Sequence, residues 1–508
     1  HLFFTPVNRT LLSSLMGMQI WDNIKGVDVL VNRPEVDAHR IGCAGDSGGG
    51  AQTIWTAALD PRITVAVAGG AATSFAYHHS KERDFCLCNV NAGLLPHTEM
   101  HHVLGLIAPR PFAFVEGRED HMIPWDLQRE TIRRARRFYR LYGQPEAMAY
   151  FVVPEGHVLS RAKREAYYRF FVRHLKQDDD VEEIAEPPTV VPLDPDDPAL
   201  VCFPQSPPEL SRELQWHVKR EADQALADWI PPQTPADWTV FRTQRARRLR
   251  ELLLRSAGGE ESPAGSCPAS TVEERDGIRV TLWTDRWTPL QGLLAGSEKA
   301  CRGVRVIVDD AGKGSPWARQ VMDRALAAGY AALAIDLRGW GALTPVELSR
   351  DGSLDERVAA QKGLGYGVPL MGLRVADLLA AGQWAAEYTS TTSIELVGRS
   401  LGALVCLLAA VIDDGVSRVE LDELPPTFFP PTDSRDSRFL FTLVPNLISR
   451  VGDVPQLVGL VAPRECEARV ADAARWPFVP DFEEHWRPAR ACYRSAQAQE
   501  VLQLRAGK

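Results

Sequence analysis

The sequence lacks several features that would assign a protein to a particular class. It has no run of 18 consecutive apolar residues, so we expect no membrane span. Its formal net charge is −9 and its basic residues form no long block, which argues against a nucleic-acid surface. The nine cysteines show no zinc-type spacing, because Cys86-Leu-Cys88 has no second pair. The start of the chain also lacks the pattern of a signal peptide. We therefore expect no nucleic acid, membrane or metal among its partners.

The most informative stretch that is present is centred on Ser47. Residues 41–44 have the pattern of a short buried strand, residues 45–49 form a G-x-S-x-G motif, and a helix is expected to follow. A strand, a sharp turn and a helix in this order are the context of a nucleophile elbow. The outer glycines of the motif would let the strand and the helix approach closely. The N–H of Gly48 would then point at a developing oxyanion.

Strands and helices alternate along the first third of the chain. Apolar runs predict strands, and amphipathic patterns predict the helices between them. Residues 71–102 are irregular and are the expected place of a cap or substrate loop. The alternation predicts an α/β fold with a doubly wound sheet. A helix is expected at 16–31, before the elbow. After the elbow, strands are expected at 62–68, 111–115 and 147–153, and helices are expected at 127–142 and 159–175.

Changes in composition divide the chain into three segments. Residues 1–177 hold the pattern just described. Repeated Pro and Asp residues, followed by two helical patterns, predict a linker with a helical segment over 178–267. Residues 268–508 hold a second α/β pattern, with strands expected at 304–308 and 330–335. With 45% hydrophobic and 24% charged residues, the chain has an ordinary globular composition.

The third segment repeats features of the first. It contains another G-x-S-x-G motif, centred on Ser400, which lies 353 positions after Ser47. The octapeptide V-L-G-L-I-A-P-R at 103–110 recurs as L-V-G-L-V-A-P-R at 457–464, at an offset of 354. Two matches at nearly one offset predict a tandem duplication of one α/β unit.

The first copy is expected to lack its N-terminal strands, because it has no counterparts of the first strands of the second copy. Those strands would precede His1, or strands from elsewhere would take their place. One such arrangement would pair residues 304–308 with residues 41–44. It would also bring the loop at 309–314 to Ser47 as the second half of an oxyanion hole.

The second copy is expected to lack its C-terminal strand and the histidine after it. The counterpart of His157 would fall at position 511, beyond Lys508. Asp472 is a candidate acid, but no strand ending in glycine precedes it, and His485 has a helical context. A serine hydroxyl needs a positioned base to act as a nucleophile at neutral pH. We therefore expect Ser400 to be a retained turn residue without catalytic activity.

The first copy supplies a nucleophile, an acid and a base in the order Ser47, Asp120, His157. Asp120 and His157 each follow an expected strand and a glycine, so all three should meet at the carboxyl edge of the sheet. A histidine oriented by a carboxylate can take the proton of a serine hydroxyl. The alternatives are Glu119 or Asp126 as the acid and His121 as the base. Trp125 is a candidate for lining the acyl or sugar site, or for packing in the core or at its rim.

These motifs resemble the acetyl xylan esterase-like group of α/β-hydrolases, which borders the dienelactone-hydrolase-like and prolyl-oligopeptidase-like enzymes. The resemblance covers about residues 14–175 well and 300–465 more weakly. It is carried by A-G-D-S-G-G-G at 44–50, N-R-P-E-V-D at 32–37, L-I-A-P-R at 106–110 and P-E-G-H at 154–157.

The resemblance implies a serine carboxylesterase that often removes acetyl groups from plant polysaccharides. It implies that Ser47 is the nucleophile, Asp120 the acid and His157 the base, and tandem forms with a degenerate second unit fit this group. It favours a secreted or periplasmic location. A mechanism of this kind needs no metal and no organic cofactor.

The sequence thus predicts hydrolysis of a small-molecule or polysaccharide ester through an acyl-enzyme. One alternative is a peptidase of the prolyl-oligopeptidase type, although no blade-length repeat of a propeller is evident in the sequence. The other is a non-catalytic scaffold or carbohydrate-binding protein built from two decayed hydrolase units, because fold alone does not establish activity.

Overall fold

A computed structural model describes most of the chain, which divides into two compact units, Ser14–Leu210 and Ser211–Lys508. Within the described residues, no helix is both long and apolar enough to cross a membrane. The described residues are 15–71, 73–80, 93–178, 183–191, 193–194, 196–201, 210–254, 267–274, 277–285, 288–296, 301–344, 354–429, 444–476, 478–479 and 481–507.

The first unit contains a parallel sheet of four strands in the order β1-β2-β3-β4. Each expected strand and helix of this region is present, with ends that shift by a few residues. The strands are β1 (Ile41–Asp46), β2 (Ile63–Gly69), β3 (Phe112–Gly117) and β4 (Met148–Val153). The helices are α2 (Leu15–Val31), α3 (Gly48–Leu59), α4 (Phe75–Ser80), α5 (Met100–Gly105), α6 (Trp125–Leu141) and α7 (Arg161–Leu175).

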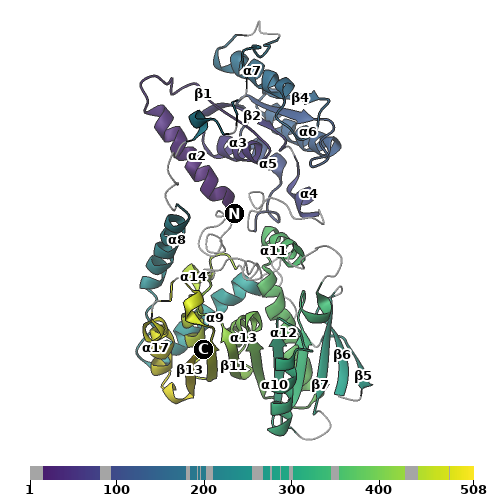
Figure 1. Ribbon diagram of the computed structural model, residues 1–508, viewed down its shortest axis with the longest axis vertical. Helices are drawn as coiled ribbons and strands as arrows, with labels where there is room; N and C mark the ends of the chain where they lie inside the picture. The colour runs from purple at the N-terminus through teal and green to yellow at the C-terminus, as the bar shows by residue number, and fades with distance from the viewer. Residues whose placement is uncertain are drawn as a thin grey trace. The chain divides into compact units, whose positions relative to one another are not determined.

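Helices cover both faces of this sheet, as expected for a doubly wound arrangement (Figure 1). On one face, Phe112 and Phe114 of β3 pack with Ile54 of α3 in a buried cluster that also includes residues of α5 and α6. On the other face, neighbouring strand residues such as Val115 pack against Phe170 of α7. Because side chains alternate along a strand, β2 and β3 supply apolar residues to both clusters.

Strand β1 lies at an edge of the four-stranded sheet. Within the described residues it pairs with β2 alone, and Gly42 and Ala44 on it are exposed. The arrangement that would pair residues 304–308 with β1 is wrong, because that segment pairs with strands of the second unit. Among the described residues of the first unit, no strand precedes β1.

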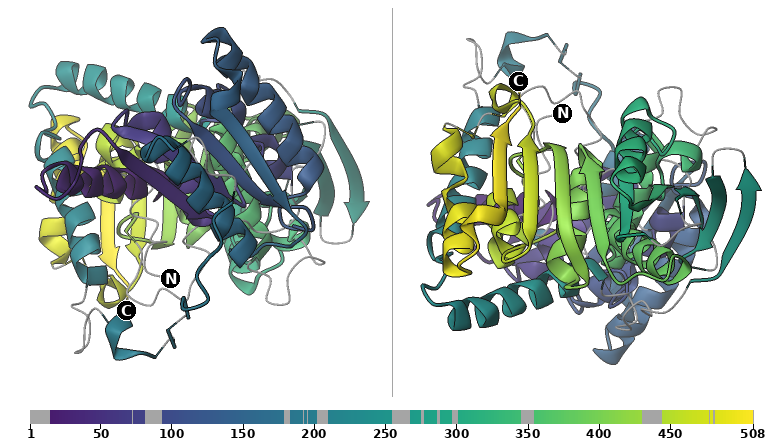
Figure 2. Two further views of the ribbon diagram at one scale, coloured as in Figure 1. Left: turned by 90° about the horizontal axis from the view of Figure 1, so that it is seen from above. Right: turned by 90° about the horizontal axis from the view of Figure 1, so that it is seen from below.

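The second unit contains a mixed sheet of nine strands, drawn side by side in the right panel of Figure 2. The order is β13-β12-β11-β10-β8-β9-β7-β6-β5, and the segment from β13 to β9 is parallel. The strands are β5 (Ala269–Glu274), β6 (Gly277–Trp283), β7 (Pro289–Ala295), β8 (Val304–Asp309), β9 (Ala331–Asp336), β10 (Ile394–Arg399), β11 (Val416–Leu424), β12 (Glu465–Val470) and β13 (Leu502–Ala506).

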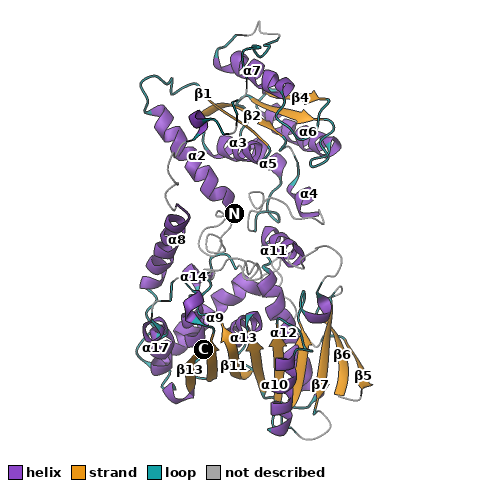
Figure 3. Ribbon diagram, in the orientation of Figure 1, coloured by secondary structure: helices purple, strands orange, loops and turns teal. Residues whose placement is uncertain are grey.

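Helices flank this second sheet (Figure 3). They are α8 (Leu210–Ala227), α9 (Pro235–Leu254), α10 (Pro316–Ala327), α11 (Leu354–Tyr366), α12 (Leu370–Tyr388), α13 (Leu401–Ile412), α14 (Leu447–Arg450), α15 (Val454–Leu460), α16 (Phe482–His485) and α17 (Arg487–Ser495). Residues 235–254, which we placed in a linker segment, pack on the second unit through Trp238, Leu249 and Leu253.

The expectation that the second copy lacks its C-terminal strand is wrong. Strand β13 pairs in parallel with β12, from Cys466 opposite Leu502 to Val470 opposite Ala506. Its sequence, L-Q-L-R-A, has two apolar side chains separated by a polar one, as suits an edge strand with one solvated face. So short a pattern gave no signal comparable with the apolar runs of the inner strands.

The two units share one set of side-chain anchors. Arg110 donates to the carbonyl oxygens of Ala57, Asp60 and Ile63 at 2.5, 3.1 and 2.6 Å. Arg464, at the matching position of the repeated octapeptide, donates in the same way to the carbonyls of residues 410, 413 and 416. A tyrosine hydroxyl then donates to the carbonyl of each arginine, from Tyr139 at 3.1 Å and from Tyr493 at 2.8 Å.

Candidate active site

The turn at Ser47 has the geometry expected of an elbow. Strand β1 ends at Asp46, helix α3 begins at Gly48, and Ser47 between them has φ 58° and ψ −120°. A non-glycine residue with such a φ is strained, so the surrounding contacts must hold it in place. The strand and the helix are in close contact here: a Cβ added to Gly45 would lie 2.3 Å from the carbonyl group of Gly49. The turn therefore needs glycine where strand and helix meet.

The structure brings Ser47, His157 and Asp120 together in one chain of hydrogen bonds. His157 Nε2 lies 2.7 Å from Ser47 Oγ, and His157 Nδ1 lies 2.6 Å from Asp120 Oδ2. One nitrogen of the imidazole thus contacts a hydroxyl group, and the other contacts a carboxyl group. This arrangement can pass a proton from the hydroxyl to the ring while the carboxylate stabilises the resulting imidazolium.

Local hydrogen bonds fix the orientation of Asp120, which follows β3. Its side chain is fully buried, and Oδ1 accepts from the N–H groups of Met122 and Ile123 at 2.9 and 3.1 Å. The oxygen that faces His157 is therefore the other one, Oδ2. Of the alternative residues, Asp126 is exposed and pairs with Arg129, and Glu119 and His121 are exposed.

The two remaining predicted residues lie at helix starts. Gly48 is the first residue of α3, so its N–H has no acceptor within the helix and is available to an anion. A Cβ added at Gly48 would meet open space. Trp125 is the first residue of α6, packs against the core of the first unit and lies 6.1 Å from the ring of Tyr150. These contacts match the packing alternative for Trp125.

Ser400 has the same backbone turn but different side-chain partners. It lies between β10 and α13 with φ 55° and ψ −121°. Its hydroxyl donates to Asp310 Oδ2 at 3.5 Å. The candidate partners are engaged locally: Asp472 Oδ1 accepts from the Ala474 N–H, and His485 Nε2 donates to the Pro426 carbonyl. Neither of these bonds leads to Ser400.

Sequence reasoning missed a group of buried polar residues beneath the Ser47 turn. Glu116 of β3 is fully buried, and burial raises the pKa of its carboxyl to about 8. Lys163 of α7 is also fully buried, and its Nζ lies 3.4 Å from Asp46 Oδ1. The signal in the sequence was a single charged residue inside the apolar strand F-A-F-V-E-G. A charged residue is rarely buried without a partner, so it marked a polar contact.

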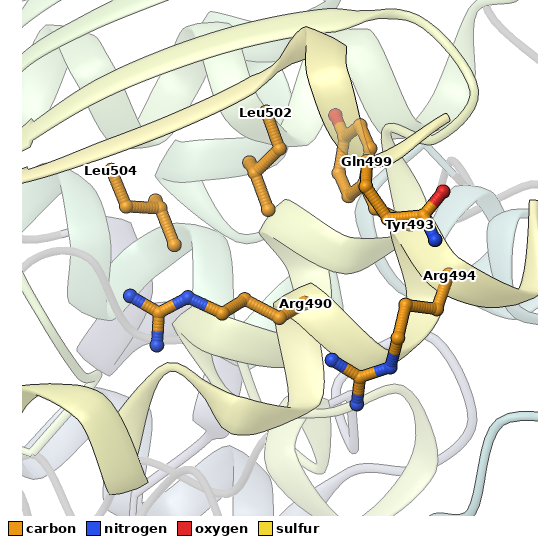
Figure 4. Close-up of a pocket in the computed structure, with 6 residues that line it drawn as sticks. All are labelled: Arg490, Tyr493, Arg494, Gln499, Leu502 and Leu504. Carbon is orange, nitrogen blue, oxygen red and sulfur yellow. The ribbon is translucent and has the colours of Figure 1, made fainter. Parts of the chain in front are cut away.

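The described residues contain no group of three or more His, Cys, Asp or Glu side chains that could hold a metal ion. A cavity of about 320 Å³ lies in the second unit, lined by residues of α17, of the turn before β13 and of β13 itself (Figure 4). It contains none of the predicted catalytic residues. Its lining residues are Arg490, Tyr493, Arg494, Gln499, Leu502 and Leu504.

Comparison with known proteins gives a family match around the elbow. Residues 18–73, which include β1, Ser47, α3 and β2, match the model of the family described as Acetyl xylan esterase (AXE1). The chain is 31% identical over 169 residues to "Putative hydrolase YtaP" of Bacillus subtilis (strain 168). The aligned region covers 32% of this chain and 54% of that protein. The chain therefore spans about half the length of this curated relative.

Solved structures of esterases are similar at low identity. A "putative acetyl xylan esterase" from Bacteroides fragilis NCTC 9343 is 14% identical with a TM-score of 0.43, covering 57% of this chain and 82% of that one. An acetyl xylan esterase from Paenibacillus sp. R4 is 16% identical with a TM-score of 0.29, and the alignment covers 56% of this chain and 91% of that one.

Proposed function

We propose that the first unit is a serine carboxylic ester hydrolase of the acetyl xylan esterase-like group, and that it deacetylates a carbohydrate such as acetylated xylan. The observation that carries this proposal is the pair of short contacts that join Ser47, His157 and Asp120. The family match over residues 18–73 supports the ester substrate class. The acetylated carbohydrate comes from the resemblance to that family.

In the proposed mechanism, His157 Nε2 takes the proton from Ser47 Oγ as the oxygen attacks the ester carbonyl. Asp120 keeps the ring in the tautomer whose Nε2 is free to accept, and it stabilises the imidazolium. The Gly48 N–H at the start of α3 donates to the oxyanion of the tetrahedral intermediate. His157 then protonates the leaving alcohol and activates the water that hydrolyses the acyl-enzyme.

We infer that the two units arose by duplication and that the second is catalytically degenerate. The shared anchors of Arg110 and Arg464 and the equal backbone angles of Ser47 and Ser400 support the duplication. The contact between Ser400 and Asp310 supports the degeneracy. A carboxylate beside the serine would repel a developing oxyanion rather than stabilise it.

Acetate release from acetylated xylan, measured beside hydrolysis of p-nitrophenyl acetate, tests the proposal. We expect Ser47→Ala to abolish both activities, and Asp120→Asn to lower kcat about 10⁴-fold because the ring loses its correct tautomer. Asp126→Asn is the matched control, since Asp126 is exposed and away from His157, and it should leave kcat unchanged.

The outcomes separate the rival functions. Ester hydrolysis that Ser47→Ala leaves intact would contradict the assigned nucleophile. Cleavage of a prolyl peptide without ester hydrolysis would favour the peptidase. Binding of xylan without any turnover would favour the scaffold, which the exposed edge strand β1 supports. Hydrolysis of p-nitrophenyl acetate but not of acetylated xylan would support the assignment as an esterase and contradict the proposed substrate.

A further inference from the structure

A buried polar cluster lies directly beneath the turn that carries Ser47. It is formed by Asp46, Glu116, Lys163 and Tyr167. Tyr167 donates its hydroxyl to the carbonyl of Gly45 at 3.0 Å, so the cluster contacts the elbow backbone as well as side chains. Burying two carboxyl groups and an ammonium group is costly unless they are paired. A cluster at this place therefore calls for a functional explanation.

Glu116 binds the backbone that follows β2. Its Oε2 accepts from the Gly70 N–H at 2.8 Å, and its Oε1 lies 3.5 Å from the Ala71 nitrogen. Gly70 has φ 57°, a conformation that glycine adopts without steric cost. The two consecutive N–H groups thus converge on one carboxyl group, which holds this turn in its left-handed shape.

The backbone at Gly70 lies close to both Ser47 and His157. A Cβ placed on Gly70 would lie 3.1 Å from His157 Cε1 and 3.3 Å from the Ser47 nitrogen. Ser47 also donates its N–H to the Gly69 carbonyl at 2.8 Å. The backbone of residues 69–71 therefore contacts both the nucleophile and the base.

We propose that Glu116 is a positioning residue for the proposed reaction: by fixing Gly70 and Ala71, it sets where the His157 ring lies against Ser47. Lys163 supports it by supplying positive charge beside Glu116 and Asp46. Small displacements matter here, because a shift of about 1 Å in a catalytic group can lower the rate about 100-fold. This inference rests on the proposed function of the same site.

The second unit has lost this cluster. Counting from the repeated octapeptide, Val470 takes the place of Glu116. Counting from the elbow serines, Arg399 takes the place of Asp46. Glu423 takes the place of Gly70, with φ 49°, and its side chain pairs with Arg399. Among the described residues, the elbow serine without a histidine partner thus lies in the unit that has Val470 at the position of the buried Glu116, as a positioning role predicts.

Glu116→Gln, compared with the wild type above the Glu116 pKa of about 8, is the test variant: the ionised carboxylate can accept from both backbone N–H groups, whereas Gln keeps the shape but offers one acceptor and one donor. We expect kcat for p-nitrophenyl acetate to fall about 10-fold with KM changed less than about twofold. We also expect the downfield NMR signal of the His157 Nδ1 proton to shift or broaden. Asp60→Asn is the matched control, because Asp60 is buried at the opposite end of β2, and it should leave both readouts unchanged.

Wild-type kcat and an unshifted signal in folded Glu116→Gln would overturn the proposal. The NMR signal needs no turnover, so it still tests the positioning role if the protein hydrolyses no ester and the proposed function fails. If Glu116→Gln does not fold, Lys163→Met keeps both carboxylate oxygens and removes the adjacent cation. A displaced His157 signal in that variant supports the proposal, and an unchanged signal with unchanged kcat contradicts it.

Discussion

The turns at Ser47 and Ser400 have nearly equal backbone angles and quite different surroundings. Both follow a parallel strand and precede a 12-residue helix. Ser47 faces an imidazole at 2.7 Å, whereas Ser400 faces the carboxylate of Asp310 at 3.5 Å. The comparison teaches that glycine packing is enough to maintain an elbow. The acid and the base beside Ser47 come from two other strand ends, those of β3 and β4, and the turn at Ser400 forms without contacts of this kind in the described residues.

The strands that carry the two serines also differ in their neighbours. Strand β10 lies between β8 and β11 and is almost completely buried, whereas β1 pairs with β2 alone within the described residues and is partly exposed. The more complete sheet therefore belongs to the unit whose elbow serine has no histidine partner among the described residues. Completeness of the sheet and completeness of the catalytic residues are separate properties in this chain.

Covalent labelling gives the largest expected contrast between the two turns. A fluorophosphonate should phosphonylate Ser47 at least about 10³-fold faster than Ser400, because His157 can take the proton of Ser47 and no described histidine contacts Ser400. Peptide mass spectrometry of the labelled protein measures both rates in one sample. Equal labelling of both serines would remove the distinction between them.

A methyl group at Gly70 tests whether the space beside His157 is needed for catalysis. Gly70→Ala should lower kcat about 10- to 100-fold, because the new Cβ would lie 3.1 Å from His157 Cε1 and the residue has φ 57°. The reverse change in the second unit, Glu423→Gly, should add no ester hydrolysis to the Ser47→Ala protein. Steady-state kinetics on p-nitrophenyl acetate checks both, and a Gly70→Ala enzyme with wild-type kcat would show that the space is not needed.

The shared arginine anchors predict the smallest effect, on stability, and predict that it is alike in both units. Arg110→Met and Arg464→Met should each lower local stability by about 2–4 kcal/mol, because each leaves backbone carbonyls without a donor. Amide hydrogen exchange of β2 and β11 measures the two effects separately. Arg33→Met is the control, since Arg33 is exposed. A loss in one unit only would weaken the case for duplication.

The sequence was sufficient for the features that leave a strong local pattern. The apolar runs, the G-x-S-x-G motifs and the glycines after strand ends predicted the α/β fold and the meeting of Ser47, Asp120 and His157. These patterns reflect the periodicity of each strand and helix and the geometry of each turn, which are local properties. The repeated octapeptide predicted a duplication, but it did not reveal that its arginine donates to backbone carbonyls about 50 positions away.

The features that were missed depend on tertiary contacts. Strand β13 has too few apolar residues to be distinguished from a loop, and β12 supplies its hydrogen bonds. The sequence predicts helical segments at the position of α9, but it does not reveal that Trp238 and Leu249 pack this helix into the core of the second unit. The role of Glu116 could not be read from spacing, because its partners at Gly70 and Lys163 lie 46 and 47 positions away.

The backbone strain at the two serines has a consequence for evolution. A non-glycine residue in a left-handed conformation costs roughly 1–2 kcal/mol, and Ser400 bears this cost although its hydroxyl faces a carboxylate. Neutral drift would be expected to relax a strain that serves no purpose. It has not done so, because a Cβ on Gly398 would lie 2.6 Å from the carbonyl oxygen of Gly402, so the helix and strand lock the turn between them. The packing of strand and helix alone therefore accounts for the strained turn at Ser400, whether or not its hydroxyl takes part in a reaction.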